Sequence, residues 1–293
     1  MIAFNHNIHF QDEPTLDDAI YDANKENIYI IRSTDHTSFE ALAFKSDYLP
    51  LSGREACYGA EKSYSECKIG CQWGVDVKSL MSFVWCCGDR SITYTPHKEY
   101  TAELLQFWIL HTILPMLFAL DGSYNILHVG AVEVQGRPLL FSAESFGGKS
   151  TITDYFLKQG HRLISDDTVG IYEDKGRFMA VASYPFHRPY REAESLGFKV
   201  DEVMVGTKPI HAVYLLEKSE VDAKIIIEEV KGIAKYRAFH FSTFINFDFL
   251  KAQHFKILST MANSVPVYKV TVPWELKRLS EVYRTIVQHS VLI

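Results

Sequence analysis

The sequence has no obvious leader, no membrane-length apolar run and no excess of basic residues. Its first residues, Met-Ile-Ala-Phe-Asn-His, contain neither a basic region nor a long apolar stretch, so we expect no signal peptide. Residues 104–120 are mostly apolar, but they fall short of the roughly 20 residues that cross a bilayer. We expect a buried helix there, kinked or broken near Pro115, in a cytoplasmic protein without a membrane role. The net charge of −6 argues against a broad nucleic-acid surface, which needs clustered Lys and Arg.

Cysteine is scarce, and all 5 cysteines precede residue 90: Cys57, Cys67, Cys71, Cys86 and Cys87. An odd number of cysteines without a secretory leader favours reduced thiols over a disulfide framework. Cys67 and Cys71 could join the adjacent Cys86 and Cys87 in a four-thiolate zinc site, but the spacing is unusual and adjacent ligands are awkward. Buried free cysteines are the simpler interpretation.

The composition allows one large core or two moderate ones, since 47% of the 293 residues are hydrophobic. Before residue 98, short strand-like runs at 28–32, 75–77 and 83–85 alternate with turns. They predict a small sheet-rich α+β domain over residues 1–97, with a helix near 16–24 that Thr15 caps. The sequence does not indicate what this domain does. Residues 98–293 form the second predicted domain.

The second half alternates strand and helix patterns, which predicts an α/β fold around a mixed sheet. Strands at 127–134 and 137–142 should be joined by a turn at Gln135-Gly136, and Gly160 should end the helix that follows. The remaining predicted strands are 162–165, 168–173, 177–182, 211–216, 223–230 and 265–272, and the remaining helices are 243–253 and 274–288.

The most informative stretch is Ala-Glu-Ser-Phe-Gly-Gly-Lys-Ser-Thr at 143–151, because an apolar run leads into it and a helical pattern follows. It predicts a phosphate-binding loop for a nucleoside triphosphate. Backbone N–H groups near the glycines would surround the phosphates, Lys149 would reach the outer ones, and Ser150 would hold Mg²⁺. The predicted nucleotide-binding residues are Ala143, Glu144, Ser145, Phe146, Gly147, Gly148, Lys149, Ser150 and Thr151.

Two adjacent carboxylates, Asp166 and Asp167, follow the strand predicted at 162–165. Beside a phosphate loop they suit phosphoryl transfer, in which one accepts the proton of an attacking hydroxyl and the other helps to hold the metal. An isolated Asp-Asp pair would more simply be a solvated turn. Arg188 and Arg191 could contact the transferred phosphate, with a structural ion-pairing role equally open.

The run Gln-Gly-His-Arg-Leu-Ile-Ser-Asp-Asp-Thr-Val at 159–169, with Leu127-His128 and Gly130-Ala131-Val132 before the loop, resembles the catalytic domain of HPr kinase/phosphorylases. The resemblance covers about 125–220 and includes Pro-Tyr-Arg-Glu-Ala-Glu-Ser-Leu-Gly at 189–197. It implies a mixed β-sheet P-loop core akin to phosphoenolpyruvate carboxykinase, with ATP and Mg²⁺ as cofactors. The small sheet-rich domain would precede this core.

The resemblance also implies roles for particular residues. Asp166 falls on the family's catalytic aspartate, His128 on its active-site histidine and Glu192 on its metal-associated glutamate. The implied catalytic residues are Asp166, His128 and Lys149, and the implied metal ligands are Ser150, Asp167 and Glu192.

The chain also departs from the family pattern. Ala143 and Phe146 stand where the family loop usually has glycine. Ala143 fits the turn if its φ is negative. Phe146 suggests an altered loop or an aromatic lid over the phosphates, because a bulky residue rarely adopts a positive φ. No clear basic signature follows Gly197, and the family's usual N-terminal domain is not recognisable, so we do not expect HPr itself as the substrate or assume reverse phosphorolysis.

These features favour an ATP- and Mg²⁺-dependent kinase that acts on a serine or threonine hydroxyl of a peptide or small protein. Two alternatives stay open: a kinase for a small hydroxylated metabolite, and a catalytically silent ATP-binding regulator. The intact Asp166 disfavours the regulator, whereas Phe146 leaves it open. The resemblance makes a homo-oligomer plausible, but the sequence identifies neither the acceptor nor the oligomeric state.

Overall fold

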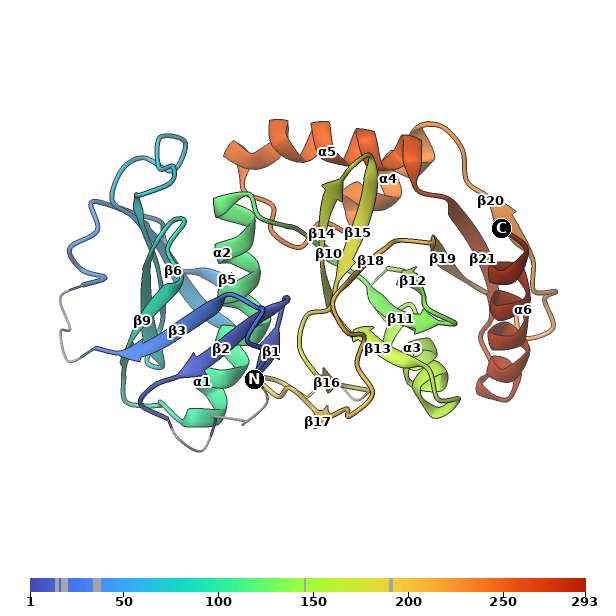
Figure 1. Cartoon of the computed structure of the whole chain (residues 1–293), viewed down its shortest axis with the longest axis horizontal. Coiled ribbons are helices and arrows are strands. Elements are labelled where there is room, and N and C mark those ends of the chain that lie inside the picture. Colours follow the sequence, from blue (N-terminus) through green and yellow to red (C-terminus); the bar gives the residue numbers. More distant parts are fainter. Residues whose placement is uncertain (14–15, 17–20, 34–37, 145, 190–191) are drawn as a thin grey trace. The chain divides into compact units, whose positions relative to one another are not determined.

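The computed structural model describes all residues except 14–15, 17–20, 34–37, 145 and 190–191 (Figure 1). The chain forms two compact units, Met1–Ser123 with Arg191–Leu196, and Tyr124–Tyr190 with Gly197–Ile293. The boundary expected at residue 98 differs from this division at Ser123. The reason is that the apolar helical run after residue 98 packs with the first unit, where Phe118 contacts Phe4 with ring centroids 5.5 Å apart.

The first unit contains, among its described residues, a nine-stranded sheet (blue to teal in Figure 1). The strands β2, β3 and β9 run parallel, and the other pairs are antiparallel. The order is β1 (Ile2–Ala3), β2 (His6–Phe10), β3 (Asn27–Arg32), β9 (Ser91–Pro96), β8 (Met81–Cys86), β7 (Gln72–Val77), β6 (Arg54–Ala60) and β4 (Phe44–Lys45), with β5 (Leu49–Leu51) paired to β6.

The expected strands at 28–32, 75–77 and 83–85 fall within β3, β7 and β8. Much of the helix expected near 16–24, with its cap Thr15, lies outside the described residues. Residues 21–24 are described and are not helical.

A long apolar helical run closes the first unit: α1 (Ala102–Trp108), the π-helical turn η1 (Ile109–Ile113) and α2 (Leu114–Asp121). Thr101 begins it, because its side chain accepts a 3.2 Å hydrogen bond from the Leu104 N–H. A kink or break was expected near Pro115. Pro115 lacks an N–H, and the π-helical turn before it shifts the hydrogen-bond register, so the helical run continues without a break. The run is long and apolar enough to cross a membrane, but 78% of its most apolar window is buried inside the protein. It is a core helix of this unit.

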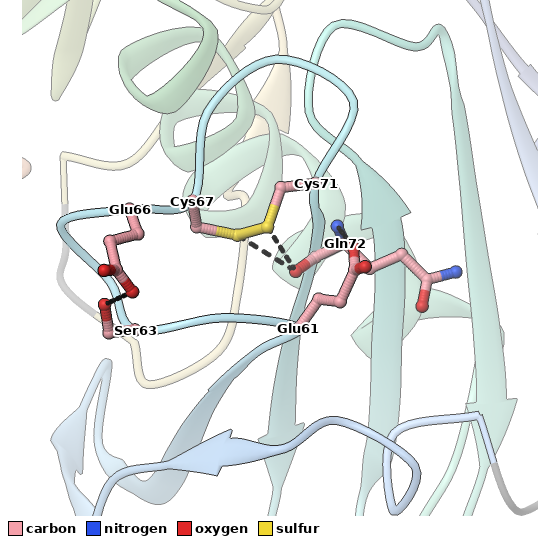
Figure 2. Close-up of a disulfide and its surroundings, with 6 residues drawn as sticks. All are labelled: Glu61, Ser63, Glu66, Cys67, Cys71 and Gln72. Atoms are coloured by element: carbon pink, nitrogen blue, oxygen red, sulfur yellow. Dashed lines mark hydrogen bonds between the residues drawn. A yellow bond between two sulfur atoms is a disulfide. The ribbon is translucent and has the colours of Figure 1, made fainter.

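The expectation of reduced cysteines is wrong at one pair, since Cys67 and Cys71 form a disulfide (Figure 2). Their Cα atoms are 5.4 Å apart, within the range that a disulfide spans. Figure 2 shows both sulfurs against the carbonyl oxygen of Gln72, in a loop where Ser63 donates a hydrogen bond to Glu66. Disulfides are rare in cytosolic proteins. The free cysteines are Cys57, Cys86 and Cys87.

The second unit contains two larger sheets and a short ribbon of β16 (Phe186–His187) with β17 (Phe198–Lys199). The strand expected over 127–134 is two strands, which separate at Val129 and enter different sheets. The mixed six-stranded sheet has the order β13 (Arg162–Ser165), β11 (Gly130–Val134), β12 (Arg137–Ser142), β19 (Ala212–Ser219), β21 (Val267–Pro273) and β20 (Ile227–Glu229). The antiparallel four-stranded sheet has the order β10 (Asn125–His128), β14 (Thr168–Asp174), β15 (Arg177–Val181) and β18 (Thr207–Pro209).

Two tight hairpins fix the register of these sheets. Gln135 and Gly136 join β11 to β12 with φ values of 50° and 80°, and Lys175 and Gly176 join β14 to β15 with φ values of 49° and 77°. Two consecutive positive φ values are typical of the type I′ turn, whose twist matches that of paired strands. The turn expected at Gln135-Gly136 is confirmed.

The six-stranded sheet is covered on both faces. Alternate residues of β12 point to opposite sides, so Phe141 packs in the cluster with α3 (Lys149–Lys158) and α6 (Leu279–Leu292). Leu140 packs in the cluster that includes the four-stranded sheet, α4 (Ile233–Phe241) and α5 (Lys251–Ser264). Because both faces are buried, the two central strands carry continuous apolar runs, at 138–141 in β12 and 212–216 in β19, which is typical of buried parallel strands.

The helix predicted at 243–253 is wrong. The chain forms α4, then η2 (Asp248–Leu250) and α5. Thr243 bridges Leu127, and the Phe244 N–H donates to the Ile126 carbonyl at 2.9 Å, so this stretch pairs with β10 and cannot be helical. The predicted helix at 274–288 begins later, after η3 (Leu276–Arg278), and the predicted strand at 223–230 shrinks to β20.

We expect Gly130→Ala to destabilise the protein through Thr153. A Cβ atom on Gly130 would lie 2.5 Å from Thr153 Oγ1, where β11 passes α3. The Thr153 hydroxyl is buried and makes no hydrogen bond with the described residues, so its removal should cost little. Gly130→Ala should lower the free energy of unfolding by about 1–3 kcal/mol. In urea unfolding, the double variant with Thr153→Ala should recover much of this loss. If the losses of the two single variants simply add up in the double variant, the proposed clash between Gly130 and Thr153 is wrong.

Candidate active site

The loop at 143–148 connects the end of β12 to the start of α3. Gly148 precedes α3 with a φ of 88°, a conformation that favours glycine. Gly147 has no room for a side chain, because a Cβ atom there would lie 2.7 Å from the Ala143 Cβ and 2.9 Å from the Glu144 carbonyl oxygen. Its own N–H donates to that oxygen at 2.9 Å. Both glycines of the motif are therefore required by the loop's backbone.

Lys149 is the first residue of α3 and is only 4% exposed. Its ammonium group donates to the carbonyl oxygens of Ala143 at 3.0 Å and Glu144 at 3.4 Å. The side chain thus folds back over the loop that precedes it. A buried cation needs such partners, because an uncompensated charge in a low-dielectric interior is costly.

Phe146 has a backbone conformation that is rare for a bulky residue. Its φ is 59°, so this bulky residue does adopt the left-handed conformation, and its side chain is 79% exposed. Ala143 keeps a negative φ, as its fit to the turn requires. Ser145 lies outside the described residues, and Ser150 is half-buried.

Asp166 and Asp167 form the connection between the two sheets, since β13 ends at Ser165 and β14 begins at Thr168. The Ser165 hydroxyl accepts the N–H groups of Asp167 at 3.2 Å and Thr168 at 2.9 Å and donates to the Thr168 carbonyl at 2.6 Å. It also accepts a hydrogen bond from Ser183 at 2.9 Å. The turn is fixed by these bonds, and Asp166 and Asp167 are only 5% and 8% exposed.

The two carboxylates have different partners. Asp166 Oδ2 accepts the Arg188 N–H at 2.8 Å and lies 3.3 Å from His187 Nδ1. Asp167 Oδ1 lies 3.1 Å from His128 Nδ1, and its Oδ2 accepts the Arg188 guanidinium at 3.2 Å. His128 reaches Asp167 because it pairs with Thr168 at the end of the β10–β14 ladder. Asp166 and Asp167 thus share Arg188, through its backbone and its side chain respectively, and each contacts a different histidine.

Tyr184 lies buried near this acidic pair. Burial raises the pKa of its phenol, and the negative charge of Asp167 raises that pKa further. The phenol therefore stays neutral over the physiological range. It contributes no charge to balance the carboxylates, which leaves that task to Arg188 and to the histidines when these are protonated.

A polar cavity of about 850 Å³ opens beside the 143–148 loop. Both His128 and Lys149 line it, so the structure brings together two of the predicted catalytic residues. It lies where β12 and β19 end, the edge at which open α/β sheets commonly bind ligands. Other lining residues are Ser142, Phe146, Glu217, Lys218, Phe241 and Lys269.

The predicted metal set is only partly assembled. Glu192 is exposed and belongs to the segment 191–196 of the first unit, so its convergence with Asp166 stays a prediction. Arg191 lies outside the described residues. The described part of the chain contains no group of three or more His, Cys, Asp or Glu side chains suited to a metal. The hydroxyl of Ser150 and the carboxylate of Asp167 are hard oxygen donors that fit Mg²⁺, which commonly uses one or two carboxylates together with phosphate oxygens.

Sequence reasoning missed His187, which is fully buried between two carboxylates. Its Nε2 lies 3.4 Å from Asp154 Oδ1, while its Nδ1 faces Asp166. The one available signal was its place beside Arg188. The glycine of the Leu-Gly pair in the sequence motif has a physical reason here. Gly197 lies directly against the His187 carbonyl, so a Cβ atom on Gly197 would clash with that oxygen.

We expect Gly197→Ala to disturb the aspartates through His187. Gly197 and Gly176 share a φ of 77°, but a Cβ atom on Gly176 would meet nothing within 4 Å. Both substitutions carry the same backbone strain, of about 1 kcal/mol. Gly197→Ala should lower the free energy of unfolding by clearly more than Gly176→Ala, as measured in urea. Equal losses would show that the contact with His187 is unimportant.

No protein-family model matches the chain. A curated HPr kinase/phosphorylase from Clostridium botulinum (strain Eklund 17B / Type B) is 26% identical over 212 residues, which cover 67% of this chain and 62% of that protein. Another from Clostridium novyi (strain NT) is 28% identical over 179 residues, covering 60% of this chain and 52% of that protein. The aligned part thus spans between 52% and 62% of the length of these relatives.

Among solved structures, the HPr(Ser) kinase/phosphatase from Coxiella burnetii matches with a TM-score of 0.36 at 12% sequence identity. The match covers 57% of this chain and 91% of the other. The curated relatives agree with the resemblance found in the motif residues: in sequence, the chain is similar to HPr kinase/phosphorylases.

Proposed function

We propose that this protein is an ATP- and Mg²⁺-dependent kinase that transfers the γ-phosphoryl group to a serine or threonine hydroxyl of a peptide or small protein. The observation that carries the proposal is the polar cavity beside the 143–148 loop. Lys149 and His128 line it together, and His128 contacts Asp167. The curated relatives support a kinase-like activity.

In this proposal the 143–148 loop binds the phosphates. Backbone N–H groups at the start of α3 favour anions, and the two glycines let the backbone approach closely. Lys149 exchanges its two carbonyl acceptors for phosphate oxygens, which form stronger, charge-assisted hydrogen bonds. Mg²⁺, when bound, would neutralise part of the phosphate charge and orient the γ-phosphoryl group. Ser150 and Asp167 are the proposed ligands, and Glu192 stays a candidate.

Asp166 is the proposed general base. The acceptor hydroxyl would lose its proton to Asp166 while its oxygen forms a bond to the γ-phosphorus and the bond from that phosphorus to ADP breaks. Asp166 Oδ1 is buried and makes no hydrogen bond with the described residues, whereas Oδ2 is held by Arg188 and His187. The free oxygen is the one suited to accept the proton.

The cavity also suits a peptide acceptor. Phe146 and Phe241 line it and are strongly exposed, so they offer apolar surface to a side chain beside the reacting hydroxyl. Lys218 and Lys269 line the same cavity, where Lys269 is ion-paired with Glu217 at 3.3 Å. We place the reaction in the cytoplasm, where ATP is available.

Phosphoryl transfer should depend on Lys149. Wild-type protein incubated with γ-labelled ATP, Mg²⁺ and a cell extract should label a polypeptide, and Lys149→Ala should abolish both labelling and ATP binding in calorimetry. Lys231→Ala is the matched control, because this exposed lysine does not line the cavity. Label only in small molecules would instead support a metabolite kinase. Intact ATP binding without any transfer would support a silent regulator.

Exchanging each aspartate for asparagine should separate their roles. Asp166→Asn should lower the transfer rate by ~10²-fold or more at unchanged ATP affinity, because the amide cannot accept the proton. Asp167→Asn should mainly raise the Mg²⁺ concentration needed for half-maximal activity. Initial rates across an Mg²⁺ titration measure both effects. The reverse pattern would make Asp167 the base, consistent with its contact to His128.

A further inference from the structure

A second cavity, of about 290 Å³, also adjoins this loop. Gly147 and Gly148 of the loop and Thr151 of α3 line it, and Gly147 and Leu216 also line the polar cavity. Its remaining wall is almost entirely apolar, with Ile152, Val272, Trp274, Leu276, Leu279 and Val282.

Trp274 forms part of the wall of this cavity. Its indole ring packs on the loop, with a ring carbon 3.5 Å from the position that a Cβ atom on Gly148 would take. Lys218 Nζ lies 4.5 Å from the ring centroid, in a cation–π contact. Because Lys218 lines the polar cavity while the ring lines the apolar one, Trp274 stands between the two cavities.

The two cavities offer opposite chemistry at one loop. The polar one holds Lys149 and His128, whereas the charged side chain in the wall of the apolar one is Glu275. That carboxylate accepts the Lys277 N–H at 3.4 Å and so begins η3. The apolar cavity therefore fits a flat, uncharged ring that is joined to a group bound at the glycines of the loop.

We propose that the apolar cavity binds the base of the nucleotide, stacked against Trp274. This inference rests on the proposed function, in which the loop binds the phosphates. A nucleotide joins its flat base to its phosphates through a single sugar, and the cavity adjoins the loop through Gly148. Bases stack well on exposed aromatic rings, and Trp274 is 42% exposed. The γ-phosphoryl group then extends toward the polar cavity, where Lys149 and the acceptor meet it.

The test compares two probes, ATP and inorganic tripolyphosphate, both with Mg²⁺ in calorimetry. Trp274→Ala should weaken ATP binding by about tenfold or more, the usual effect of removing one base–aromatic stack. It should leave tripolyphosphate binding within about twofold, because that probe has no base. Trp274→Phe should keep most of the ATP affinity. Phe255→Ala, at an exposed aromatic residue of α5 outside the cavity, is the control and should change neither affinity.

Two results would overturn the proposal. An equal loss of ATP and tripolyphosphate affinity in Trp274→Ala would mean that the ring only supports the loop. Unchanged ATP affinity, with or without weaker acceptor binding, would mean that the base binds elsewhere. If wild-type protein binds neither probe, the proposed function itself fails. If tripolyphosphate binding depends on Lys149 but ATP binding ignores Trp274, the base site alone is wrong.

Discussion

The structure depends on the burial of two adjacent carboxylates, Asp166 and Asp167. Burying charge is costly unless each group is hydrogen-bonded or paired. The groups of a single strand connection cannot pair with or hydrogen-bond both carboxylates. The segment around His187 and Arg188 therefore packs against them and supplies the missing partners. That segment in turn requires Gly197, because no side chain fits against the His187 carbonyl. The burial of this turn thus explains why the chain has His187, Arg188 and Gly197 at these positions.

The 143–148 loop stands where two chemically different cavities meet. On one side Lys149 and His128 provide charge and proton-transfer groups, and on the other Trp274 and its neighbours provide an apolar wall. This arrangement follows from the sheet, because β12 and β19 end at the same edge and α3 starts directly behind the loop. A ligand that is part charged and part aromatic would use both cavities.

Much of the local structure could be predicted because its causes are local. Gly160 has a φ of 84° where the helix α3 ends, and the turns at 135–136 and 175–176 use the residues that their backbone requires. The helix predicted at 243–253 failed because pairing of Thr243 with Leu127 overrode an apolar pattern. The reasoning about Phe146 did not hold for a different reason. Tertiary context keeps this residue at a positive φ, which is rare for a bulky side chain.

The sequence by itself determined the glycine-rich loop, the lysine after it and the position of the two aspartates, because each depends on neighbours within a few residues. Only the tertiary structure decided which groups face them. The contact of Asp166 with His187, that of Asp167 with His128, and the packing of Trp274 on Gly148 join residues from separate strands and loops. Such contacts are set by how the sheets pack, and no spacing along the chain encodes them.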